Sequence, residues 1–381
     1  MKILITTDLF TTETNGVVTS VKNLREELEK KGHDVKVLTL SENMHSHRDG
    51  NVYYIRSMSL EKVYPNIRMP LSYHHKLIKE LVRWKPDIIH SQCEFFSYQF
   101  ALYISKKTGA HIVHTYHTLY EQYVSYVFPS KRIGRRVVKL LSRKRLKKAS
   151  AVIAPTRKVE DALQGYGVKT PISVVPSGIS LDQHKNRISP EERERKRVSY
   201  GIENNDIALI NLGRLGTEKN IGELLKFFAV AAKNNEHLKF LIVGDGPAKS
   251  ELEALTVSLN ITDKVVFTGM VKPTEVQNYY QLGDIFVSAS TSETQGLTYI
   301  EACANGLPLL CRRDPCFEDV MVEGENGYCY EDEQSFVENL GKMIAFPTWL
   351  ENAKKKSEQL AAAFDKATFG DAVENVYDSI I

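Results

Sequence analysis

The stretch from Asp284 to Cys311, DIFVSASTSETQGLTYIEACANGLPLLC, decides the fold of this chain. Its two ends, residues 284–290 and 307–311, are short apolar-rich runs of the kind that form buried β-strands. Between them, a turn-prone Gln-Gly pair precedes an apolar segment that fits a helix beginning near Gly296 or Leu297. Two strands joined by such a crossover helix pair in parallel. The stretch therefore predicts a β-α-β unit of a parallel sheet.

The same alternation of β-rich runs and helical patterns continues through most of the chain. Residues 17–31, for example, repeat apolar side chains at helical spacing and are followed by Gly32 as a stop signal. This rhythm predicts the α/β class with two doubly wound parallel sheets. The expected strands span residues 2–7, 34–40, 87–91, 111–116, 151–156 and 172–178 in the first half, and 208–215, 238–244, 264–269, 284–290 and 307–311 in the second.

The length of 381 residues favours two domains over one core. The polar segment 180–197, which carries Pro190, reads as a connector into the second domain. We place the first domain at residues 1–185 and the second at 186–365, with a last helical pattern at 366–381. Doubly wound sheets bind ligands beyond the carboxyl ends of their strands, so two such domains facing each other would share a cleft.

The composition limits the classes of function that fit this chain. The formal net charge is only +3, which does not call for nucleic acid. The five cysteines include no C-x-x-C pair and suit reduced thiols in a cytosolic chain. No apolar run reaches the length that spans a bilayer. We therefore expect a cytoplasmic protein whose membrane contact is peripheral.

Two cations follow the strand expected at 208–215, in the sequence GRLGTEKN. Arg214 stands at the end of this strand, and Lys219 follows five residues later, just before a helix. Both would lie at a carboxyl strand end beside a helix N-terminus, which suits a diphosphate. Surface Arg and Lys are more often only solvated, so the pair alone does not define a site.

The loop after the strand at 284–290 supplies two carboxylates, Glu293 in the loop and Glu301 eight positions later in the helix. The free N–H groups near Gly296 would point at the same end of the sheet and receive phosphate oxygens. A carboxylate beside a phosphate is costly unless it binds hydroxyls. We therefore interpret Glu293 as an acceptor for sugar hydroxyls and Glu301 for ribose hydroxyls. Alone, Glu301 would read as a solvated or capping residue.

The first half offers fewer candidates. Gly16, at the turn in TETNGVVTS, permits backbone approach to a ligand, although a loop glycine is more often only a turn residue. In HTYHTLYEQY, His117 and Thr118 follow the strand at 111–116, whereas His114 is expected inside it. A lone histidine in a cleft is more often a polar contact than a catalyst.

These motifs resemble those of the retaining glycosyltransferases of family 4. ETQGLTYIE has that family's E-x7-E pattern, and GRLGTEKN looks like its Arg and Lys diphosphate clamp. With NGVVTS, HTYHT and FTGMV, the similarity spans nearly the whole chain. Within the family, the combination of NGVVTSVKNL, HTYHTLYEQY and SASTSETQGLTYIEA is most similar to the bacterial 1,2-diacylglycerol 3-alpha-glucosyltransferases, which make monoglycosyl-diacylglycerol.

The resemblance implies a GT-B fold, in which two Rossmann-like domains face an interdomain cleft and the C-terminal helix returns to the first domain. The second domain would bind a nucleotide-sugar, usually UDP-hexose, and the first the acceptor. The implied reaction moves glucose from UDP-glucose to the 3-hydroxyl of 1,2-diacylglycerol. Catalytic roles are implied for His117, Arg214, Lys219 and Glu293, and donor contacts for Gly16, Arg214, Lys219, Met270, Glu293, Thr294, Gln295, Gly296, Leu297, Thr298 and Glu301.

The same residues bear on mechanism. Breaking the anomeric bond leaves negative charge on UDP, which Arg214, Lys219 and the helix start at 296–298 would stabilise. No D-x-D pair occurs, so we expect no metal and no other cofactor. By resemblance, the departing phosphate oxygen takes the acceptor proton without a protein nucleophile. His117 would then hold the donor sugar or stabilise the oxocarbenium-like state.

A strongly basic segment, KRIGRRVVKLLSRKRLKK at residues 131–148, has ten Lys or Arg and no acid among eighteen residues. Its apolar residues Ile133, Val137, Leu140 and Leu141 fall on one helical face. Such a helix suits an anionic membrane surface. The alternative is a solvated crossover helix whose apolar stripe packs on its own sheet. The residues expected to meet acceptor or membrane are Thr118, Tyr120, Arg135, Arg136, Lys139, Arg143, Lys144 and Arg145.

The aromatic residues Tyr120, Tyr123, Tyr126 and Phe128 precede this basic run without interleaving through it. This arrangement disfavours nucleic acid, and the aromatic side chains would suit a path for acyl chains.

Three other functions compete with this interpretation. VGDGPAK suggests a dinucleotide loop, but Lys249 stands where G-x-G-x-x-G needs its third glycine, which disfavours a dehydrogenase. A non-catalytic basic module would explain residues 131–148 but not the second domain. A family 4 enzyme that uses UDP-galactose, or a glycolipid or soluble acceptor, is the closest competitor, because the sequence does not distinguish glucose from galactose. The sequence does not specify the oligomeric state either.

Overall fold

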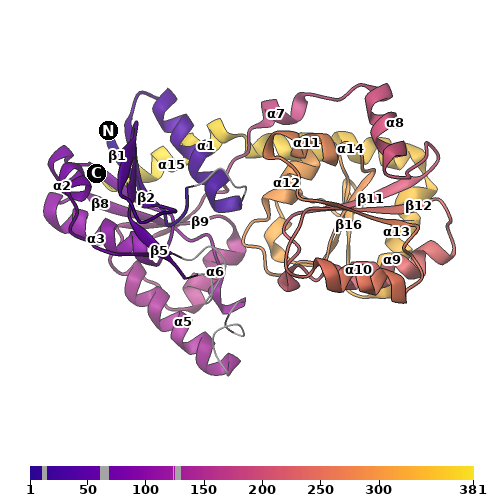
Figure 1. The fold of residues 1–381 in the computed structure, drawn as a ribbon, viewed down its shortest axis with the longest axis horizontal. Helices are drawn as coiled ribbons and strands as arrows, with labels where there is room; N and C mark the ends of the chain where they lie inside the picture. Colours follow the sequence, from indigo (N-terminus) through magenta and orange to yellow (C-terminus); the bar gives the residue numbers. More distant parts are fainter. Residues whose placement is uncertain (11–14, 61–67, 123, 125–129) are drawn as a thin grey trace. The chain divides into compact units, whose positions relative to one another are not determined.

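The computed structural model describes residues 1–10, 15–60, 68–122, 124 and 130–381, which fold into two compact units (Figure 1). The first unit is Met1–Gly178 with Lys366–Ile381, and the second is Ile179–Asp365. Residues 179–185, which we assigned to the first domain from sequence, thus belong to the second unit. Each unit has a largely parallel sheet with helices on both faces, so the predicted pair of doubly wound Rossmann-like domains is confirmed.

The first unit is built on an eight-stranded sheet with the order β10-β9-β8-β7-β1-β2-β4-β3, parallel except for the β3–β4 pair. A separate antiparallel pair, β5 (Ser57–Ser59) and β6 (Arg68–Pro70), lies outside it. Neither β3, β4 nor this pair was predicted, because none of them contains the consecutive aliphatic residues that marked the other strands. The strands of the main sheet are β1 (Lys2–Thr6), β2 (Asp34–Leu40), β3 (His47–Asp49), β4 (Val52–Ile55), β7 (Ile88–Ser91), β8 (His111–Thr115), β9 (Ala151–Ala154) and β10 (Ile172–Val174).

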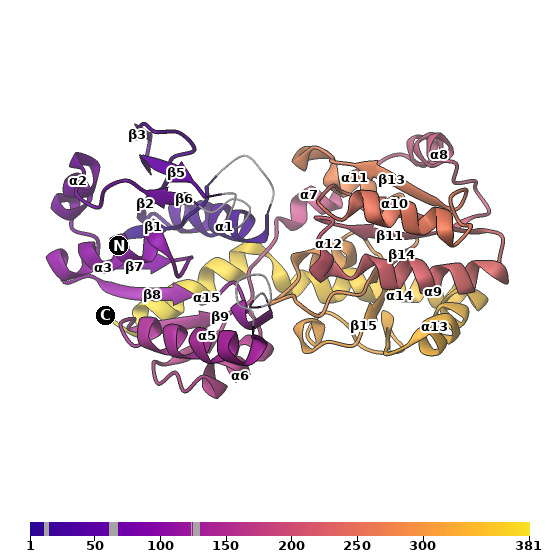
Figure 2. The same cartoon turned by 60° about the horizontal axis from the view of Figure 1, so that its bottom comes forward.

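Helices cover both faces of this sheet. On one face, α1 and α15 lie side by side in Figures 1 and 2 and share a buried cluster, with Leu24 and Leu28 of α1 against Phe369, Val373 and Tyr377 of α15. The C-terminal helix is therefore an integral part of the first unit. The helices of this unit are α1 (Gly16–Lys30), α2 (Lys76–Trp84), α3 (Phe96–Thr108), the 3-10 turn η1 (Tyr120–Gln122), α5 (Lys131–Leu146), α6 (Arg157–Gly165) and α15 (Lys366–Asp378).

The second unit has a six-stranded, fully parallel sheet with the order β13-β12-β11-β14-β15-β16. Five of its strands agree with the prediction within a few residues, and β16 was not predicted. The strands are β11 (Ile207–Leu212), β12 (Leu238–Val243), β13 (Val265–Gly269), β14 (Ile285–Ser288), β15 (Leu309–Arg312) and β16 (Gly327–Tyr330).

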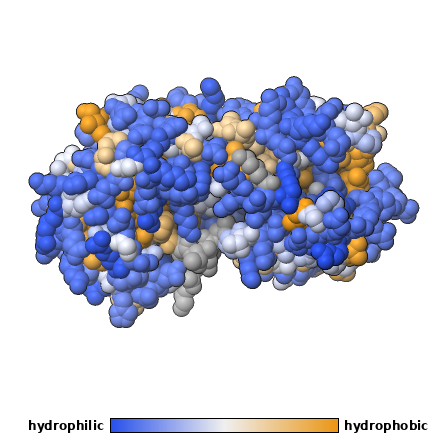
Figure 3. All heavy atoms as spheres, turned by 90° about the horizontal axis from the view of Figure 1, so that it is seen from above, coloured by the Kyte–Doolittle hydropathy of each residue, from blue (hydrophilic) through white to orange (hydrophobic). Residues whose placement is uncertain are grey.

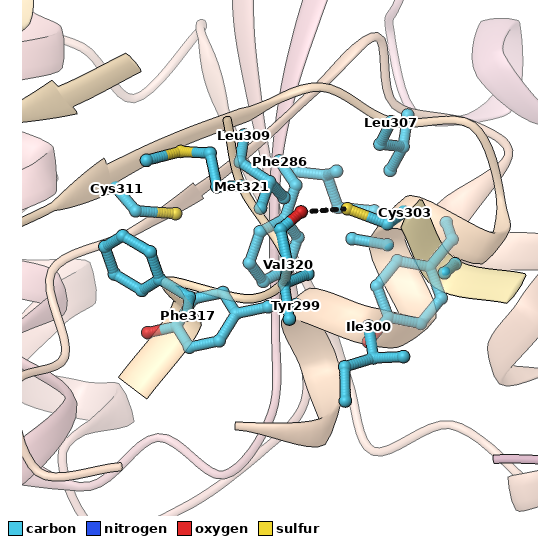
Figure 4. Close-up of a cluster of buried hydrophobic side chains, with 14 of the residues drawn as sticks. Phe286, Tyr299, Ile300, Cys303, Leu307, Leu309, Cys311, Phe317, Val320 and Met321 are labelled. Carbon is cyan, nitrogen blue, oxygen red and sulfur yellow. Dashed lines mark hydrogen bonds between the residues drawn. The ribbon is translucent and has the colours of Figure 1, made fainter. Parts of the chain in front are cut away.

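Two buried clusters flank this sheet, one of them beneath α12. Figure 4 shows Tyr299, Ile300 and Cys303 of α12 in that cluster, where the Cys303 thiol lies 3.9 Å from the Val320 carbonyl oxygen. The helices of this unit are α7 (Leu181–Lys185), α8 (Pro190–Ser199), η2 (Thr217–Lys219), α9 (Ile221–Lys233), α10 (Lys249–Ser258), η3 (Pro273–Glu275), α11 (Val276–Tyr280), α12 (Leu297–Ala304), η4 (Pro315–Phe317), α13 (Glu333–Ala345), α14 (Pro347–Ala361) and η5 (Ala362–Phe364).

The polar segment 180–197, which we interpreted as a connector, lies within the second unit and forms α7 and most of α8. Ser189 caps α8 by accepting a hydrogen bond from the Glu192 N–H at 3.1 Å. Arg197 is buried, with Nη1 3.0 Å from Asp284 Oδ2. The polar composition of segment 180–197 therefore includes a residue, Arg197, that anchors α8 on the second unit.

The described surface is mostly hydrophilic. On the face drawn in Figure 3, hydrophobic residues form separate spots in a hydrophilic surround. Within the described ranges, no helix is both long and apolar enough to cross a bilayer. The five cysteines are free thiols, four of them buried.

Candidate active site

In the second unit, the strand order reverses between β11 and β14, which are neighbours in the sheet but far apart in sequence. Parallel α/β sheets bind ligands at the carboxyl side of such a switch point. The loop that carries Arg214 leaves β11 there, and the loop that carries Glu293 leaves β14 beside it. The topology thus brings the two predicted motifs to one edge of the sheet.

The loop that carries Arg214 is packed directly against two glycines of VGDGPAK. A Cβ on Gly244 would lie 2.0 Å from the Gly213 carbonyl oxygen, and one on Gly246 would lie 2.5 Å from the Leu215 carbonyl oxygen. Both glycines therefore allow two loop backbones to meet. This packing explains them without a bound dinucleotide.

Each predicted cation at this edge is paired with a carboxylate. Lys219 Nζ contacts Glu293, which also accepts a hydrogen bond from Ser290 Oγ at 3.0 Å. Arg214 Nη2 contacts Glu218, which the sequence analysis did not identify. The structure thus joins two predicted residues directly and adds a third carboxylate, adjacent to Lys219 in sequence.

The start of α12 supplies backbone donors beside this pair. Gly296 precedes the helix in the left-handed conformation, with φ 70°. A Cβ there would lie 2.3 Å from the Tyr299 ring, so glycine is required by the helix cap itself as well as permitting ligand approach. The N–H groups of Leu297 and Thr298, in the first turn, have no intrahelical acceptor. Gln295 is buried, whereas Thr294, Leu297 and Thr298 are partly buried.

Glu301 lies one turn further along α12 and contacts a different partner. Its Oε2 accepts a hydrogen bond from the Tyr280 hydroxyl at 2.8 Å. Burial raises the pKa of Glu301 to about 7, although the Tyr280 hydrogen bond opposes this shift. Met270 directly follows β13, and its side chain is exposed. Both predicted residues thus belong to the same unit as Arg214 and Lys219.

In the first unit, β1, β7 and β8 are adjacent, so the loops after them leave the same edge of the sheet. His117, just beyond β8, has its Nε2 2.6 Å from Gln92 Oε1. Burial, with a smaller effect of His114, lowers the pKa of His117 to about 3. A neutral imidazole at physiological pH suits hydrogen bonding better than proton abstraction. Gly16 begins α1, and Thr118 is partly buried.

Two acidic residues at this edge were missed from sequence. Glu94 is buried and accepts a hydrogen bond from the Tyr120 hydroxyl at 2.6 Å, with His114 Nε2 3.2 Å away. Asp8 Oδ1 accepts a hydrogen bond from the Ser97 N–H at 2.6 Å, and burial raises the pKa of Asp8. Asp8 lies two residues beyond β1 and Glu94 three residues beyond β7, a position at a strand end like the one that identified Arg214.

The basic segment forms α5, and three of the four residues of its apolar stripe point outward. The side chains of Ile133, Leu140 and Leu141 are 59%, 55% and 47% exposed, whereas Val137 is partly buried. The interpretation that this stripe packs on its own sheet is therefore wrong. The inward positions are instead Gly134, Val138, Ser142 and Leu146.

The cations of α5 share its exposed surface. Arg135, Arg136, Lys139, Arg143 and Lys144 are exposed. Arg145 is partly buried, with its guanidinium 6.0 Å from the centre of the Phe95 ring. Tyr123, Tyr126 and Phe128 lie outside the described residues.

Comparisons with known proteins agree with this arrangement. Residues 14–183 match the domain described as Glycosyltransferase Family 4, and residues 192–361 match Glycosyl transferases group 1. The Anabaena Alr3699/HepE structure in complex with UDP and glucose has a TM-score of 0.76 at 17% identity, over 100% of both chains. At that identity the likeness shows the fold alone.

Two relatives are closer in sequence. The chain is 34% identical to an alpha-monoglucosyldiacylglycerol synthase of Streptococcus pneumoniae (strain ATCC BAA-255 / R6), over 100% of this chain and 86% of the relative. It is 30% identical to an alpha-monoglucosyldiacylglycerol synthase of Acholeplasma laidlawii, over 100% of this chain and 98% of the relative. The chain therefore belongs to the family 4 glycosyltransferases of the GT-B fold, and it is an enzyme of glycosyl transfer.

Proposed function

We propose that this glycosyltransferase moves glucose from UDP-glucose to the 3-hydroxyl of 1,2-diacylglycerol, with retention of the α-configuration. The enzyme would act as a peripheral protein on the inner face of the cell membrane. The main observation in favour of a lipid acceptor is that α5 exposes both apolar and cationic side chains. The names of the two alpha-monoglucosyldiacylglycerol synthases compared above support both the sugar and the lipid.

The donor would be held by the second unit. Arg214, Lys219 and the first N–H groups of α12 would bind the diphosphate, while Glu293 and Glu301 accept hydroxyls of the hexose and the ribose. The pairing of Lys219 with Glu293 supports this assignment, since one cation and one hydroxyl acceptor then lie where phosphate and sugar are joined. The exposed strand end at Met270 would meet the base through its backbone.

Catalysis would follow from stabilising the departing UDP. The bond between the anomeric carbon and the diphosphate breaks, and the extra negative charge is placed on oxygens held by Arg214, Lys219 and α12. The departing phosphate oxygen takes the proton of the acceptor hydroxyl, and the acceptor oxygen bonds to the anomeric carbon on the same face. His117, with its lowered pKa, would position the sugar by a hydrogen bond. We propose that no metal takes part.

Docking would bring the acceptor hydroxyl to this chemistry. Each basic residue near an anionic membrane surface contributes about 1 kcal/mol, so the exposed cations of α5 suffice for reversible binding. The outward Ile133, Leu140 and Leu141 would enter the interface between headgroups and acyl chains.

The deciding experiment incubates the enzyme with diacylglycerol vesicles and either UDP-glucose or UDP-galactose in the presence of EDTA, with mass spectrometry of the lipids. We expect a monohexosyl-diacylglycerol from UDP-glucose at an unchanged rate in EDTA. A product from UDP-galactose alone would overturn the choice of sugar, and absence of any lipid product would overturn the acceptor. Loss of activity in EDTA would contradict metal independence.

The raised pKa of Glu301 predicts that UDP affinity falls in mild acid. Ribose hydroxyls donate to a carboxylate, and protonation removes that acceptor. Because the pKa is about 7, the ionised fraction, and with it the affinity, decreases about tenfold between about pH 8 and about pH 6. Titration calorimetry measures this change.

Glu301→Gln is the control for that titration, because UDP's own terminal phosphate also gains a proton over this range. The wild-type to variant ratio isolates the protein's contribution. A ratio that stays constant across the range would mean that the Glu301 carboxylate does not bind the ribose.

The contact between Gly246 and the loop that carries Arg214 predicts a further loss. Gly246→Ala would place its Cβ against the Leu215 carbonyl and shift the loop, so UDP affinity should fall roughly tenfold to a hundredfold. The matched control is Gly341→Ala in α13, where the added Cβ meets nothing within 4 Å. Calorimetry with UDP and a thermal unfolding scan measure both. Wild-type affinity in Gly246→Ala would show that the loop tolerates displacement.

A further inference from the structure

We propose that Glu218 is a positioning residue for Arg214. Its carboxylate holds one edge of the guanidinium, so that the remaining N–H groups are presented to the diphosphate of the donor. This inference rests on the proposed function, because it assumes that Arg214 binds the diphosphate.

The two partners differ in how firmly they are held. The Glu218 side chain is 11% exposed, whereas that of Arg214 is 47% exposed. A long cationic side chain at the surface loses rotamer freedom when it is fixed. The less exposed Glu218 carboxylate therefore orients the guanidinium, rather than the reverse. Guanidinium has five N–H donors, and a contact at Nη2 leaves others for phosphate oxygens.

The neighbouring glycine supports a built arrangement. Gly216 has φ −104°, which any residue adopts, so the backbone does not require glycine there. A Cβ on Gly216 would, however, lie 2.4 Å from Glu218 Oε1 and 2.7 Å from its Cδ. The carboxylate thus folds back over the glycine, into space that a side chain at 216 would occupy.

The turn η2 is also tied to the second loop of the site. Ser292 Oγ lies 3.4 Å from the Glu218 carbonyl oxygen, and the next residue, Lys219, contacts Glu293. One short turn thus directs a carboxylate toward Arg214 and a cation toward Glu293. A carboxylate that merely competed with the diphosphate would need neither the space at Gly216 nor this anchoring.

Glu218→Ala separates positioning from competition. If Glu218 positions Arg214, then Glu218→Ala and Gly216→Ala each weaken UDP binding roughly tenfold, since a misplaced group loses most of its contribution. Glu218→Gln keeps an oxygen acceptor and loses a negative charge, so it binds UDP at least as well as the wild type. Calorimetric titration of the full chain with UDP measures all three, and Gly341→Ala serves as the control glycine substitution. Unchanged or tighter binding in Glu218→Ala would overturn the proposal.

A double-mutant cycle separates positioning from a general structural effect. Once Arg214→Ala has removed the guanidinium, Glu218→Ala should cause no further loss of UDP affinity. A further tenfold loss in the double variant would mean that Glu218 acts on the fold rather than through Arg214. If Arg214→Ala itself leaves UDP binding unchanged, the proposed diphosphate site fails, which is a result distinct from failure of this inference.

Discussion

Lys219→Ala is expected to lower kcat by roughly a hundredfold to a thousandfold, the usual loss when one donor to a developing negative charge is removed. The ammonium group contacts Glu293, so its removal also takes a positive charge away from that carboxylate, next to the place proposed for the phosphate. The barrier then rises both from the lost donor and from the weaker compensation of the Glu293 charge. Steady-state kinetics with UDP-glucose and diacylglycerol vesicles measure the change.

The matched control is Lys356→Ala. The Lys356 side chain is exposed to a similar degree, 30% against 28% for Lys219, and it pairs with Glu325 at 2.6 Å. This pair belongs to α14 and a surface loop of the same unit, so we expect unchanged kcat. Lys219→Arg should retain part of the activity, because it preserves the charge but not its position. A Lys219→Ala enzyme with wild-type kcat would remove the electrostatic basis of the proposed mechanism.

Reversal of four exposed charges on α5 is expected to abolish binding to anionic vesicles. The variant replaces Arg135, Arg136, Lys139 and Arg143 by Glu. At about 1 kcal/mol for each basic residue, loss of four weakens binding roughly a thousandfold before the repulsion of the new carboxylates is counted. Arg145 is better left unchanged, because its guanidinium lies near Phe95 and its carbonyl accepts a hydrogen bond from Tyr98. Vesicle co-sedimentation measures the loss.

A control of equal net charge reverses Lys106, Lys107, Lys233 and Lys355, which are exposed on α3, α9 and α14. Vesicle binding should survive this change, and both variants should bind UDP normally. A third variant, Ile133, Leu140 and Leu141 to Ser, tests the apolar contribution, and these side chains are too exposed to support the fold. Equal loss in the α5 and control charge variants would indicate general electrostatic attraction instead of a docking face.

The sequence predicted the framework well because periodicity reports burial. The parallel strands at the centre of each sheet, such as β14 with its buried Ile285, Phe286 and Val287, contain consecutive apolar residues and were located within a few residues. The edge strands β3 and β16, and the short pair β5–β6, were missed because none of them contains a run of aliphatic residues. The segment 180–197 was misread because a polar composition does not distinguish a loop from a helix anchored by Arg197.

The candidate site was predicted only in part. The sequence analysis identified the residues that stand close to the end of a strand or the start of a helix. These are Arg214, Lys219, Glu293 and Glu301. Their pairings join residues four to seventy-four positions apart, and no local pattern specifies which carboxylate meets which cation. Glu218 was overlooked for this reason.

The sequence also did not predict which face of α5 packs against its unit. Spacing places Ile133 and Leu140 on one face of the helix but does not say whether that face meets the sheet or the solvent. Small residues at Gly134 and Ser142 allow the opposite face to approach the body of the unit. The exposed apolar stripe is consequently a structural finding.

The return of α15 to the first unit constrains the order in which the enzyme is made. Phe369, Val373 and Tyr377 complete a hydrophobic core whose other buried members lie between Ile3 and Val175. Residues 366–381 must therefore leave the ribosome before the first unit can close, whereas the second unit ends at Asp365. During synthesis the half that is translated later can finish folding first, and the earlier half waits with an open apolar groove that chaperones would recognise.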